Sequence, residues 1–275
     1  MNALATALSA LAVATAPPAA GRYVDLPGLR MYCEVHGEGR PLVLLHGGGS
    51  TVQTSFGALL PLLARRHRVI APEQQGHGHT PDADRPLSFE QMADDTAALL
   101  ERLGVRDADV LGYSNGGLVA MQLARRHPAL VRRLVLASSY FERSGMPPAF
   151  WQGFETARLE DMPAALREAH RAVAPGPDGM AAMFTKTVAM MKAFRDWPEE
   201  ALRGIRGPSL VMVGDADVMS VEHAARMARL LPGGRLAVFP GSTHGTYLGA
   251  AEGARPGSPL PGLAVAMIEA FLAEP

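Results

Sequence analysis

The chain has 275 residues, of which 48% are hydrophobic and 19% are charged, and its formal net charge is −1 at pH 7. This size and apolar content suffice for one large domain with a buried core and an insertion. The near-neutral charge and the scattered basic residues exclude the concentrated positive surface that a nucleic-acid partner needs. The single Cys33 excludes an intramolecular disulfide and a metal site built from several cysteines.

The first 20 residues form an Ala-rich N-terminal extension that has two interpretations. Residues 3–16 consist of Ala, Leu, Val, Ser and Thr, and they end in small residues typical of a signal-peptide cleavage site. However, no Lys or Arg precedes this run, and Pro17 would directly follow the cut. We therefore expect a cytoplasmic protein, with a secreted or periplasmic location as the alternative if residues 1–16 act as a signal peptide. No later run has the length of a membrane span, so no stable membrane insertion is expected.

From residue 22 onward, short β-rich runs alternate with helical ones. Arg22 to Leu26 and Leu29 to Val35, separated by Pro27-Gly28, predict an antiparallel hairpin. The alternation that follows predicts an α/β fold with a mostly parallel, doubly wound sheet of about eight strands and right-handed crossovers. The further predicted strands are Pro41–Leu45, Arg68–Ala71, Ala108–Leu111, Arg133–Ala137, Ser209–Val213 and Leu236–Phe239, and the predicted helices are Phe56–Arg66, Ser88–Leu103, Leu118–Arg126, Val221–Leu231 and Leu260–Leu272.

The regular alternation stops between residues 140 and 205. This region has no strand-like run, and its apolar residues from Met180 to Met191 follow a period of 3.6. We interpret residues 140–205 as a helical lid insertion over the carboxyl edge of the sheet, and residues 21–139 with 206–275 as the core domain. The Met, Phe and Trp side chains of the lid either line an adaptable apolar pocket or form the small core of the insertion itself.

Gly112-Tyr113-Ser114-Asn115-Gly116 lies between a predicted strand and a predicted helix, with a serine at the apex of the turn. Glycines at both ends leave room for a strained backbone at Ser114 and for close approach of the strand to the helix. This arrangement is typical of a nucleophile elbow. The alternative is a serine in an ordinary glycine-rich turn.

A serine at its ordinary pKa is a weak nucleophile, so it needs an adjacent base and an acid that orients the base. Asp217 and His244 lie in the loops that follow the last two predicted strands, so both are expected at the same edge of the sheet as Ser114. We predict that these three residues form a catalytic triad. Asp215 in the same loop and Glu142 after the preceding strand are the alternative acids.

Hydrolysis through a tetrahedral intermediate also needs donors to the oxyanion. The backbone N–H of Asn115, directly after the nucleophile, is one candidate, and an N–H from the loop after Leu45 is the other. We predict that Gly48 supplies this second N–H, because a residue without a side chain lets the substrate carbonyl come close.

These motifs, together with His46-Gly47-Gly48-Gly49-Ser50, Gly76-His77-Gly78 and Gly241-Ser242-Thr243-His244, resemble those of the α/β-hydrolase superfamily. The similarity spans about residues 22 to 272 and is closest to serine hydrolases with a helical lid. It implies catalysis without a metal or an organic cofactor. In that family the acid usually stands three residues after the strand-terminal glycine, which favours Asp217 over Asp215. Two departures are Glu73, where the family usually has Asp, and Thr243, where it usually has Gly.

The resemblance implies a serine hydrolase that cleaves an ester-type acyl bond of a small, largely apolar substrate through an acyl-enzyme intermediate. The alternatives on the same triad are a C–C bond hydrolase, a lactonase or a perhydrolase. A non-catalytic small-molecule receptor with this fold is a further hypothesis from another class. We expect substrate contacts from Tyr113, Phe141, Trp151, Met183 and Met191. The oligomeric state and the natural substrate are not predicted.

Overall fold

The computed structural model describes residues 21–176 and 178–275, so the N-terminal extension, including its alternative interpretation as a signal segment, lies outside the described residues. Its centre is an eight-stranded sheet in the order β1-β2-β4-β3-β5-β6-β7-β8. Strand β2 is antiparallel to β1 and β4, and the other neighbours are parallel. The strands are β1 (Arg22–Leu26), β2 (Leu29–His36), β3 (Arg40–Leu45), β4 (His67–Pro72), β5 (Ala108–Tyr113), β6 (Val131–Ala137), β7 (Ser209–Gly214) and β8 (Arg235–Phe239). The predicted fold class is confirmed.

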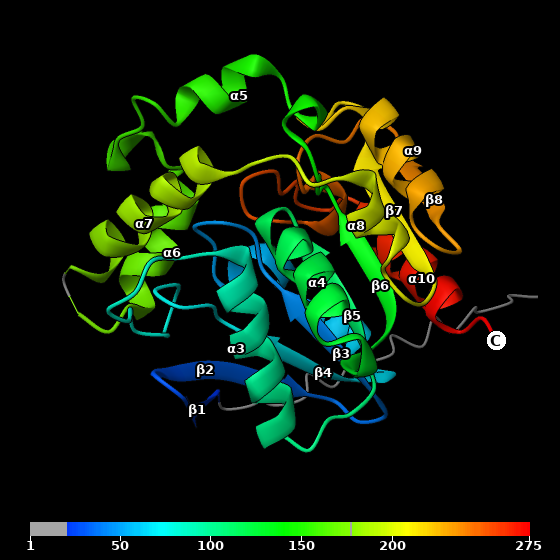
Figure 1. The fold of residues 1–275 in the computed structure, drawn as a ribbon, viewed down its shortest axis with the longest axis horizontal. Helices are drawn as coiled ribbons and strands as arrows, with labels where there is room; N and C mark the ends of the chain where they lie inside the picture. Colours follow the sequence, from blue (N-terminus) through cyan, green and yellow to red (C-terminus); the bar gives the residue numbers. More distant parts are fainter. Residues whose placement is uncertain (1–20, 177) are drawn as a thin grey trace, which may run out of the picture.

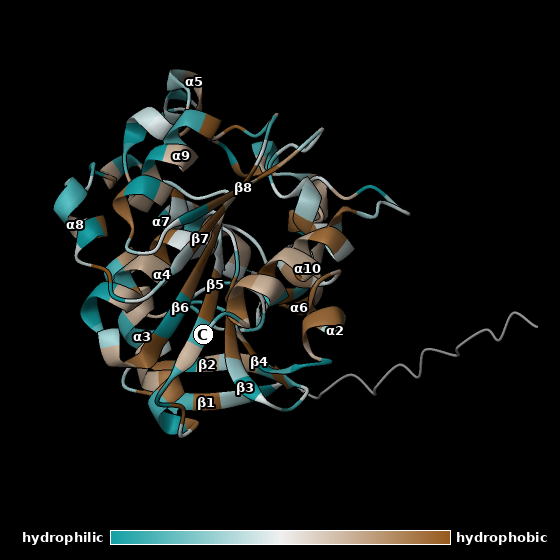
Figure 2. Ribbon diagram, turned by 90° about the vertical axis from the view of Figure 1, so that its right-hand side faces the viewer, coloured by the Kyte–Doolittle hydropathy of each residue, from teal (hydrophilic) through white to brown (hydrophobic). Residues whose placement is uncertain are grey.

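Helices cover both faces of the sheet (Figures 1 and 2). One face carries α3 (Phe89–Arg102), α4 (Asn115–Arg126) and α9 (Val221–Leu230), and the other carries α1 (Val52–Phe56), α2 (Leu60–Leu63) and α10 (Leu260–Leu272). Successive strand residues point to opposite faces, so Val43 and Leu45 pack with the first group while Leu42 and Leu44 pack with the second. Strands buried on both faces read as continuous apolar runs, which is why they are recognisable in the sequence.

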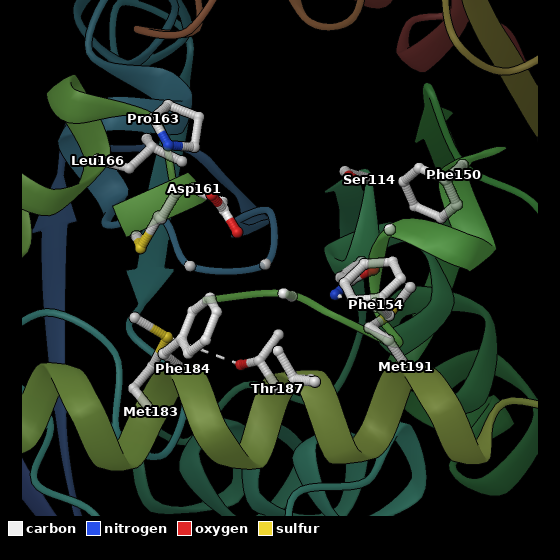
Figure 3. A pocket seen from close by; sticks show the side chains of 17 residues that line it. Ser114, Phe150, Phe154, Asp161, Pro163, Leu166, Met183, Phe184, Thr187 and Met191 are labelled. Atoms are coloured by element: carbon white, nitrogen blue, oxygen red, sulfur yellow. Dashed lines mark hydrogen bonds between the residues drawn. The ribbon is translucent and has the colours of Figure 1, made fainter. Parts of the chain in front are cut away.

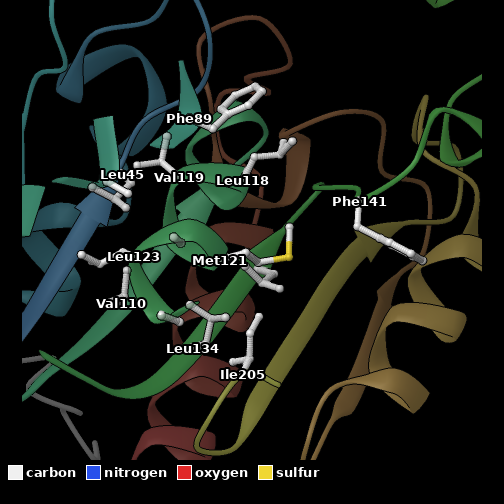
Figure 4. Packing of buried hydrophobic residues seen from close by; sticks show 14 of the residues in the cluster. Leu45, Phe89, Val110, Leu118, Val119, Met121, Leu123, Leu134, Phe141 and Ile205 are labelled. Atoms are coloured by element: carbon white, nitrogen blue, oxygen red, sulfur yellow. The ribbon is translucent and has the colours of Figure 1, made fainter. Parts of the chain in front are cut away.

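Helix α4 packs at the centre of the first face. Leu118, Met121 and Leu123 of α4 are fully buried against strand residues such as Val110 and Leu134 (Figure 4). The helix begins at Asn115, three residues before the predicted start, because the turn at Ser114 leads directly into it. The end of β5 and the first turn of α4 are therefore joined without a loop.

The predicted helix over residues 56–66 is wrong, because two short helices stand in its place. Thr51 caps α1 in a reciprocal capping box with Thr54, so that helix begins before Phe56. It ends at Gly57, and Pro61 sits in the first turn of α2, where a missing N–H costs nothing. Local capping thus starts the first helix earlier than predicted and separates it from the second.

The insertion between β6 and β7 holds α5 (Pro148–Gly153), α6 (Ala164–Val173), α7 (Gly179–Ala193) and α8 (Glu199–Arg203). Helices α6 and α7 lie side by side at the left of Figure 1, and α5 lies apart from them at the top. Helix α8 instead packs with α9 of the core through Ala201 and Leu202. The predicted lid boundaries at residues 140 and 205 therefore stay a proposal.

Polar contacts join the lid to the loop after β4. The Lys186 ammonium of α7 donates to the backbone oxygens of Ala83 at 2.6 Å and Arg85 at 2.8 Å, and pairs with the Asp82 carboxylate at 2.7 Å. His170 of α6 is fully buried, and its Nδ1 accepts the N–H of Gly78 at 3.3 Å. Two lid helices are thus bonded to the same loop.

Within the described ranges, no helix combines the length and the apolar character that crossing a membrane requires.

Two helical glycines make the close packing of the elbow testable. A Cβ at Gly116 would come within 2.0 Å of the Leu45 carbonyl oxygen, whereas one at Gly262 in α10 would meet nothing within 4 Å. We expect Gly116→Ala to lower the free energy of unfolding by about 3 kcal/mol. Gly262→Ala should stabilise the fold by about 0.5 to 1 kcal/mol, because alanine restricts the unfolded helix segment. Urea unfolding of both variants checks this, and equal effects would contradict the packing argument.

Candidate active site

Ser114 stands at the sharp turn between β5 and α4. Its backbone angles are φ 53° and ψ −123°, a conformation that residues with a Cβ rarely adopt. Its N–H is held by the carbonyl oxygen of Ala137 at 2.9 Å. The glycines on either side permit the turn, since a Cβ at Gly112 would lie 2.3 Å from the carbonyl oxygen of Gly116. The hydroxyl of Ser114 therefore projects from the carboxyl edge of the sheet.

His244 and Asp217 meet Ser114 from the loops after β8 and β7. The Oγ of Ser114 lies 3.1 Å from Nε2 of His244, and Nδ1 of His244 lies 2.8 Å from Oδ1 of Asp217. An ionised carboxylate only accepts hydrogen bonds, so Nδ1 carries the ring proton and Nε2 is left to accept from the serine hydroxyl. The structure thus brings the three predicted triad residues together in the arrangement that activates a serine.

The two alternative acids lie elsewhere. Asp215 is exposed, and its Oδ1 accepts the backbone N–H of Ser242 at 3.2 Å. Glu142 forms an ion pair with Arg226 of α9 and accepts the Ser144 hydroxyl at 2.7 Å. Neither carboxylate contacts the His244 ring within the described residues, so the geometry favours Asp217.

Burial and hydrogen bonding have opposite effects on the pKa values of Asp217 and His244. Burial disfavours the charged Asp217, whose side chain is fully inaccessible, but hydrogen bonds from His244 and Ser138 and the backbone N–H of Met219 together hold its pKa below the ordinary value. Burial likewise disfavours protonated His244, yet the hydrogen bond to Asp217 and its negative charge raise the pKa of the imidazole above 6.5. The carboxylate thus stabilises the imidazolium that would form when the serine gives up its proton.

Two backbone N–H groups face the space beside Ser114. Asn115 is the first residue of α4, where the N–H has no intrahelical acceptor. In the loop after β3, the N–H groups of Gly47 and Gly49 bind Ser55 Oγ at 3.2 Å and His77 Nε2 at 3.1 Å. Among the described residues, the N–H of Gly48 between them has no acceptor. Gly48 and Asn115 both line the cavity next to Ser114, which fits their predicted role as oxyanion donors.

Glu73, the departure from the family pattern, organises the loop after β4. Its buried carboxylate accepts the N–H of Val52 at 3.0 Å, the N–H of His79 at 2.6 Å and Nδ1 of His79 at 2.8 Å. Burial opposes its ionisation, but these hydrogen bonds lower the pKa of Glu73 below its ordinary value. The longer side chain thus joins α1 to the glycine-rich loop, and the departure leaves the triad undisturbed.

An apolar cavity of about 310 Å³ opens above Ser114, between the sheet edge and the lid. Figure 3 shows Met183, Phe184 and Thr187 of α7 along one side of it, with Phe150 and Phe154 on the Ser114 side. The lining residues are Gly48, Gly49, Ser114, Asn115, Phe150, Gly153, Phe154, Ala157, Asp161, Met162, Pro163, Leu166, Met183, Phe184, Thr187, Val188 and Met191. The predicted contacts Met183 and Met191 therefore lie in its wall.

Three other predicted substrate contacts do not line this cavity. Tyr113 is fully buried beneath His244, at 5.2 Å between ring centroids, and its hydroxyl donates to Glu252. Phe141 stacks on His223 at 4.9 Å, and Trp151 stacks on Phe194 at 5.4 Å. These three side chains pack against other residues, and their contact with a substrate stays a prediction. Phe154, Leu166 and Phe184 also line the cavity and were not predicted as substrate contacts, because helical spacing alone does not tell which side chains face a cavity.

In the part of the chain that the structure describes, no group of three or more His, Cys, Asp or Glu side chains is arranged to hold a metal ion. The polar groups next to Ser114 are instead its own hydroxyl, the His244 imidazole and the backbone N–H groups of Gly48 and Asn115. This set is suited to nucleophilic attack on a carbonyl carbon and to stabilising the resulting oxyanion.

The chain is similar to several known proteins. A 2-hydroxymuconate semialdehyde hydrolase from Pseudomonas sp. (strain CF600) is 38% identical over 125 residues, so the match spans only 44% of that relative and 44% of this chain. A protein of the same name from Pseudomonas putida is 30% identical over 260 residues, covering 86% of this chain and 91% of the relative. The solved structure of the esterase RhEst1 from Rhodococcus sp. ECU1013 matches with a TM-score of 0.71 at 25% identity, over 92% of this chain and 98% of that one.

The family assignment follows from a longer match. Residues 42–255, well over half of the chain, match the alpha/beta hydrolase family. This range runs from β3 through the elbow and the lid to the loop that carries His244. The chain is therefore a hydrolase that belongs to the alpha/beta hydrolase family.

Proposed function

We propose that this protein is a serine hydrolase that cleaves an ester bond of a small, largely apolar substrate through an acyl-enzyme intermediate. The observation that carries the proposal is the hydrogen-bonded series Ser114–His244–Asp217, which stands at the wall of an apolar cavity beside two free N–H groups. These groups supply every role that acyl transfer needs, and the chemistry draws on the protein and water alone.

The proposed reaction begins when His244 takes the proton of Ser114 as its oxygen attacks the ester carbonyl carbon. The negative charge that develops on the carbonyl oxygen is held by the N–H groups of Gly48 and Asn115, each typically contributing about 3 to 4 kcal/mol to lowering the barrier. His244 then gives its proton to the leaving alkoxide. A water molecule, activated by the same imidazole, hydrolyses the acyl-enzyme and restores the serine.

The charge of the cavity favours a neutral substrate. Of the described residues that line it, Asp161 alone carries a charge, and that charge is negative. Transfer of an anionic substrate from water to this space would lack a compensating cation, which makes binding costly. An acid such as the 2-hydroxymuconate semialdehyde named for two relatives therefore fits less well than a neutral ester, a lactone included. Cleavage of a C–C bond and perhydrolysis remain the alternatives on the same triad.

A non-catalytic receptor is the second candidate function, because a lid over an apolar cavity also suits the retention of a small molecule. The geometry of the triad argues against it, since a receptor needs no serine within hydrogen-bond distance of an oriented imidazole. Turnover of p-nitrophenyl acetate and labelling of the protein by a fluorophosphonate probe separate the two hypotheses. A receptor would show neither.

Removal of the nucleophile is the most direct test. We expect Ser114→Ala to lower kcat for p-nitrophenyl butyrate by roughly 10⁴-fold or more and to abolish fluorophosphonate labelling, because no other group can form the acyl-enzyme. The melting temperature should stay within a few degrees of the wild-type value, which would exclude a folding defect. A variant that keeps more than about a tenth of the wild-type rate would contradict the assignment of Ser114.

The acid is tested by comparing two aspartates of one loop. Asp217→Asn should lower kcat/KM by roughly 10⁴-fold, because an amide favours the wrong tautomer of His244, whereas Asp215→Asn should leave it nearly unchanged. In the wild-type enzyme, kcat/KM should fall as the pH decreases through the raised pKa of His244, above 6.5, since the protonated imidazole cannot act as a base. Initial rates from pH 5 to 9 check both points, and a larger loss for Asp215→Asn would reassign the acid.

The lid is tested by acyl-chain length. If Met183 and Met191 contact the acyl chain, kcat/KM should rise from acetate to butyrate or hexanoate by up to about 0.8 kcal/mol, or about fourfold, per buried CH₂. Replacing both methionines by alanine should flatten this dependence. Met190→Ala is the matched control, because Met190 lies on the same helix but packs in the core and does not line this cavity. An unchanged length preference in the double variant would place the acyl site elsewhere.

A further inference from the structure

Behind the triad, two buried hydroxyl groups continue the series of hydrogen bonds. Ser138 directly follows β6, and its Oγ donates to Oδ2 of Asp217 at 2.5 Å. The same Oγ lies 2.9 Å from the hydroxyl of Tyr247, which also donates to the carbonyl oxygen of Met212 at 3.1 Å. The side chains of Ser138 and Tyr247 are fully buried, so bulk water does not replace these contacts.

The number of hydroxyl protons fixes the direction of this series of hydrogen bonds. An ionised carboxylate accepts only, so the single hydroxyl proton of Ser138 is committed to Asp217. In the hydrogen bond between Ser138 and Tyr247, the Tyr247 hydroxyl must then be the donor. Its proton is shared between the Oγ of Ser138 and the carbonyl oxygen of Met212. The donors point from Tyr247 through Ser138 to Oδ2 of Asp217, while His244 donates to Oδ1 from the other side.

We propose that Ser138 and Tyr247 are positioning residues, whose hydroxyl groups hold the Asp217 carboxylate in the orientation that presents Oδ1 to His244. The proposal rests on the proposed serine hydrolase function. Without Ser138, Oδ2 would be buried with no donor, and the carboxylate would be held only at Oδ1, by His244 and the N–H of Met219. The hydrogen bond that orients His244 would then be weakened although no triad residue had changed.

The backbone at Ser138 supports a specific need for its hydroxyl. Its φ is 49°, and the only other non-glycine residue with a positive φ among the described residues is the nucleophile Ser114. Glycine would adopt this conformation without strain, yet the chain has a serine here. The next residue, Ser139, is equally buried, but its Oγ has no hydrogen-bond partner in the described part of the chain. Ser139 is therefore a matched control on the same strand end.

The experiment compares Ser138→Ala, Ser138→Gly and Ser139→Ala by ester hydrolysis and by thermal melting. Loss of the Ser138 hydroxyl should lower kcat by about 10-fold to 100-fold, a typical effect of removing a group that orients a reacting residue. KM should change little, because Ser138 does not line the cavity. Ser138→Gly relieves the backbone strain and should lose activity to the same extent as Ser138→Ala. Ser139→Ala should retain the wild-type kcat.

A structural role alone would not move the titration of His244, so its pKa is the second measurement. NMR titration of the His244 ring should give a lower pKa in Ser138→Ala than in Ser139→Ala, because the contact with Asp217 that raises it is weakened. The acid limb of kcat/KM should move to lower pH in parallel. Tyr247→Phe, which keeps the ring stacked on Phe239, should cause a smaller loss that disappears in the Ser138→Ala background.

The outcomes separate this proposal from the proposed function. Equal kcat and equal His244 pKa in Ser138→Ala and Ser139→Ala would overturn the positioning role while leaving a wild-type enzyme that is active and labelled by the fluorophosphonate. An additive loss for Tyr247→Phe would overturn its action through Ser138. A wild-type protein inert toward every ester would overturn the proposed function. The NMR comparison would still decide whether Ser138 orients Asp217 and His244.

Discussion

The close approach of α4 to the ends of β3 and β5 is the constraint on which the site depends. With no side chain at Gly116, the helix lies against the backbone carbonyls of Leu45 and His46. This contact sets the first N–H of the helix beside the glycine loop that follows β3, so both predicted oxyanion donors flank the same serine. The strain at Ser114 is maintained by the packing of α4, whose apolar side chains are fully buried on the sheet.

Parallel pairing explains why so much of the site could be predicted from the sequence. Carboxyl ends of parallel strands share one edge, so residues in the loops after β5, β7 and β8 had to meet there, and Ser114, Asp217 and His244 do. Glycines mark all three turns, and apolar runs mark the strands. The choice between Asp217 and Asp215 needed the family resemblance, because the two carboxylates are two residues apart in one loop.

Side-chain direction and local capping are features that residue types alone do not encode. Tyr113, Phe141 and Trp151 are large and lie near the site in sequence, but their rings pack against His244, His223 and Phe194. The helix expected over residues 56–66 gave way to a cap at Thr51. Ser138 was missed because a serine after a buried strand is unremarkable in sequence, and its significance comes from a carboxylate 79 positions away.

The electrostatic surroundings confine proton exchange at the nucleophile to one imidazole. His46 and His77 lie beneath the glycine loop, where burial lowers the pKa of both, that of His77 to about 3. Each is therefore neutral near pH 7, donates from Nδ1 to a backbone oxygen and accepts a backbone N–H at Nε2, from Gln74 and Gly49 respectively. These rings shape the loop that presents Gly48 without adding a positive charge beside the oxyanion site. Among the described histidines, only His244 is hydrogen-bonded to the serine hydroxyl, and the Asp217 carboxylate raises the pKa of this ring although burial opposes the rise. In the proposed mechanism, titration of this single ring would govern whether the serine is activated.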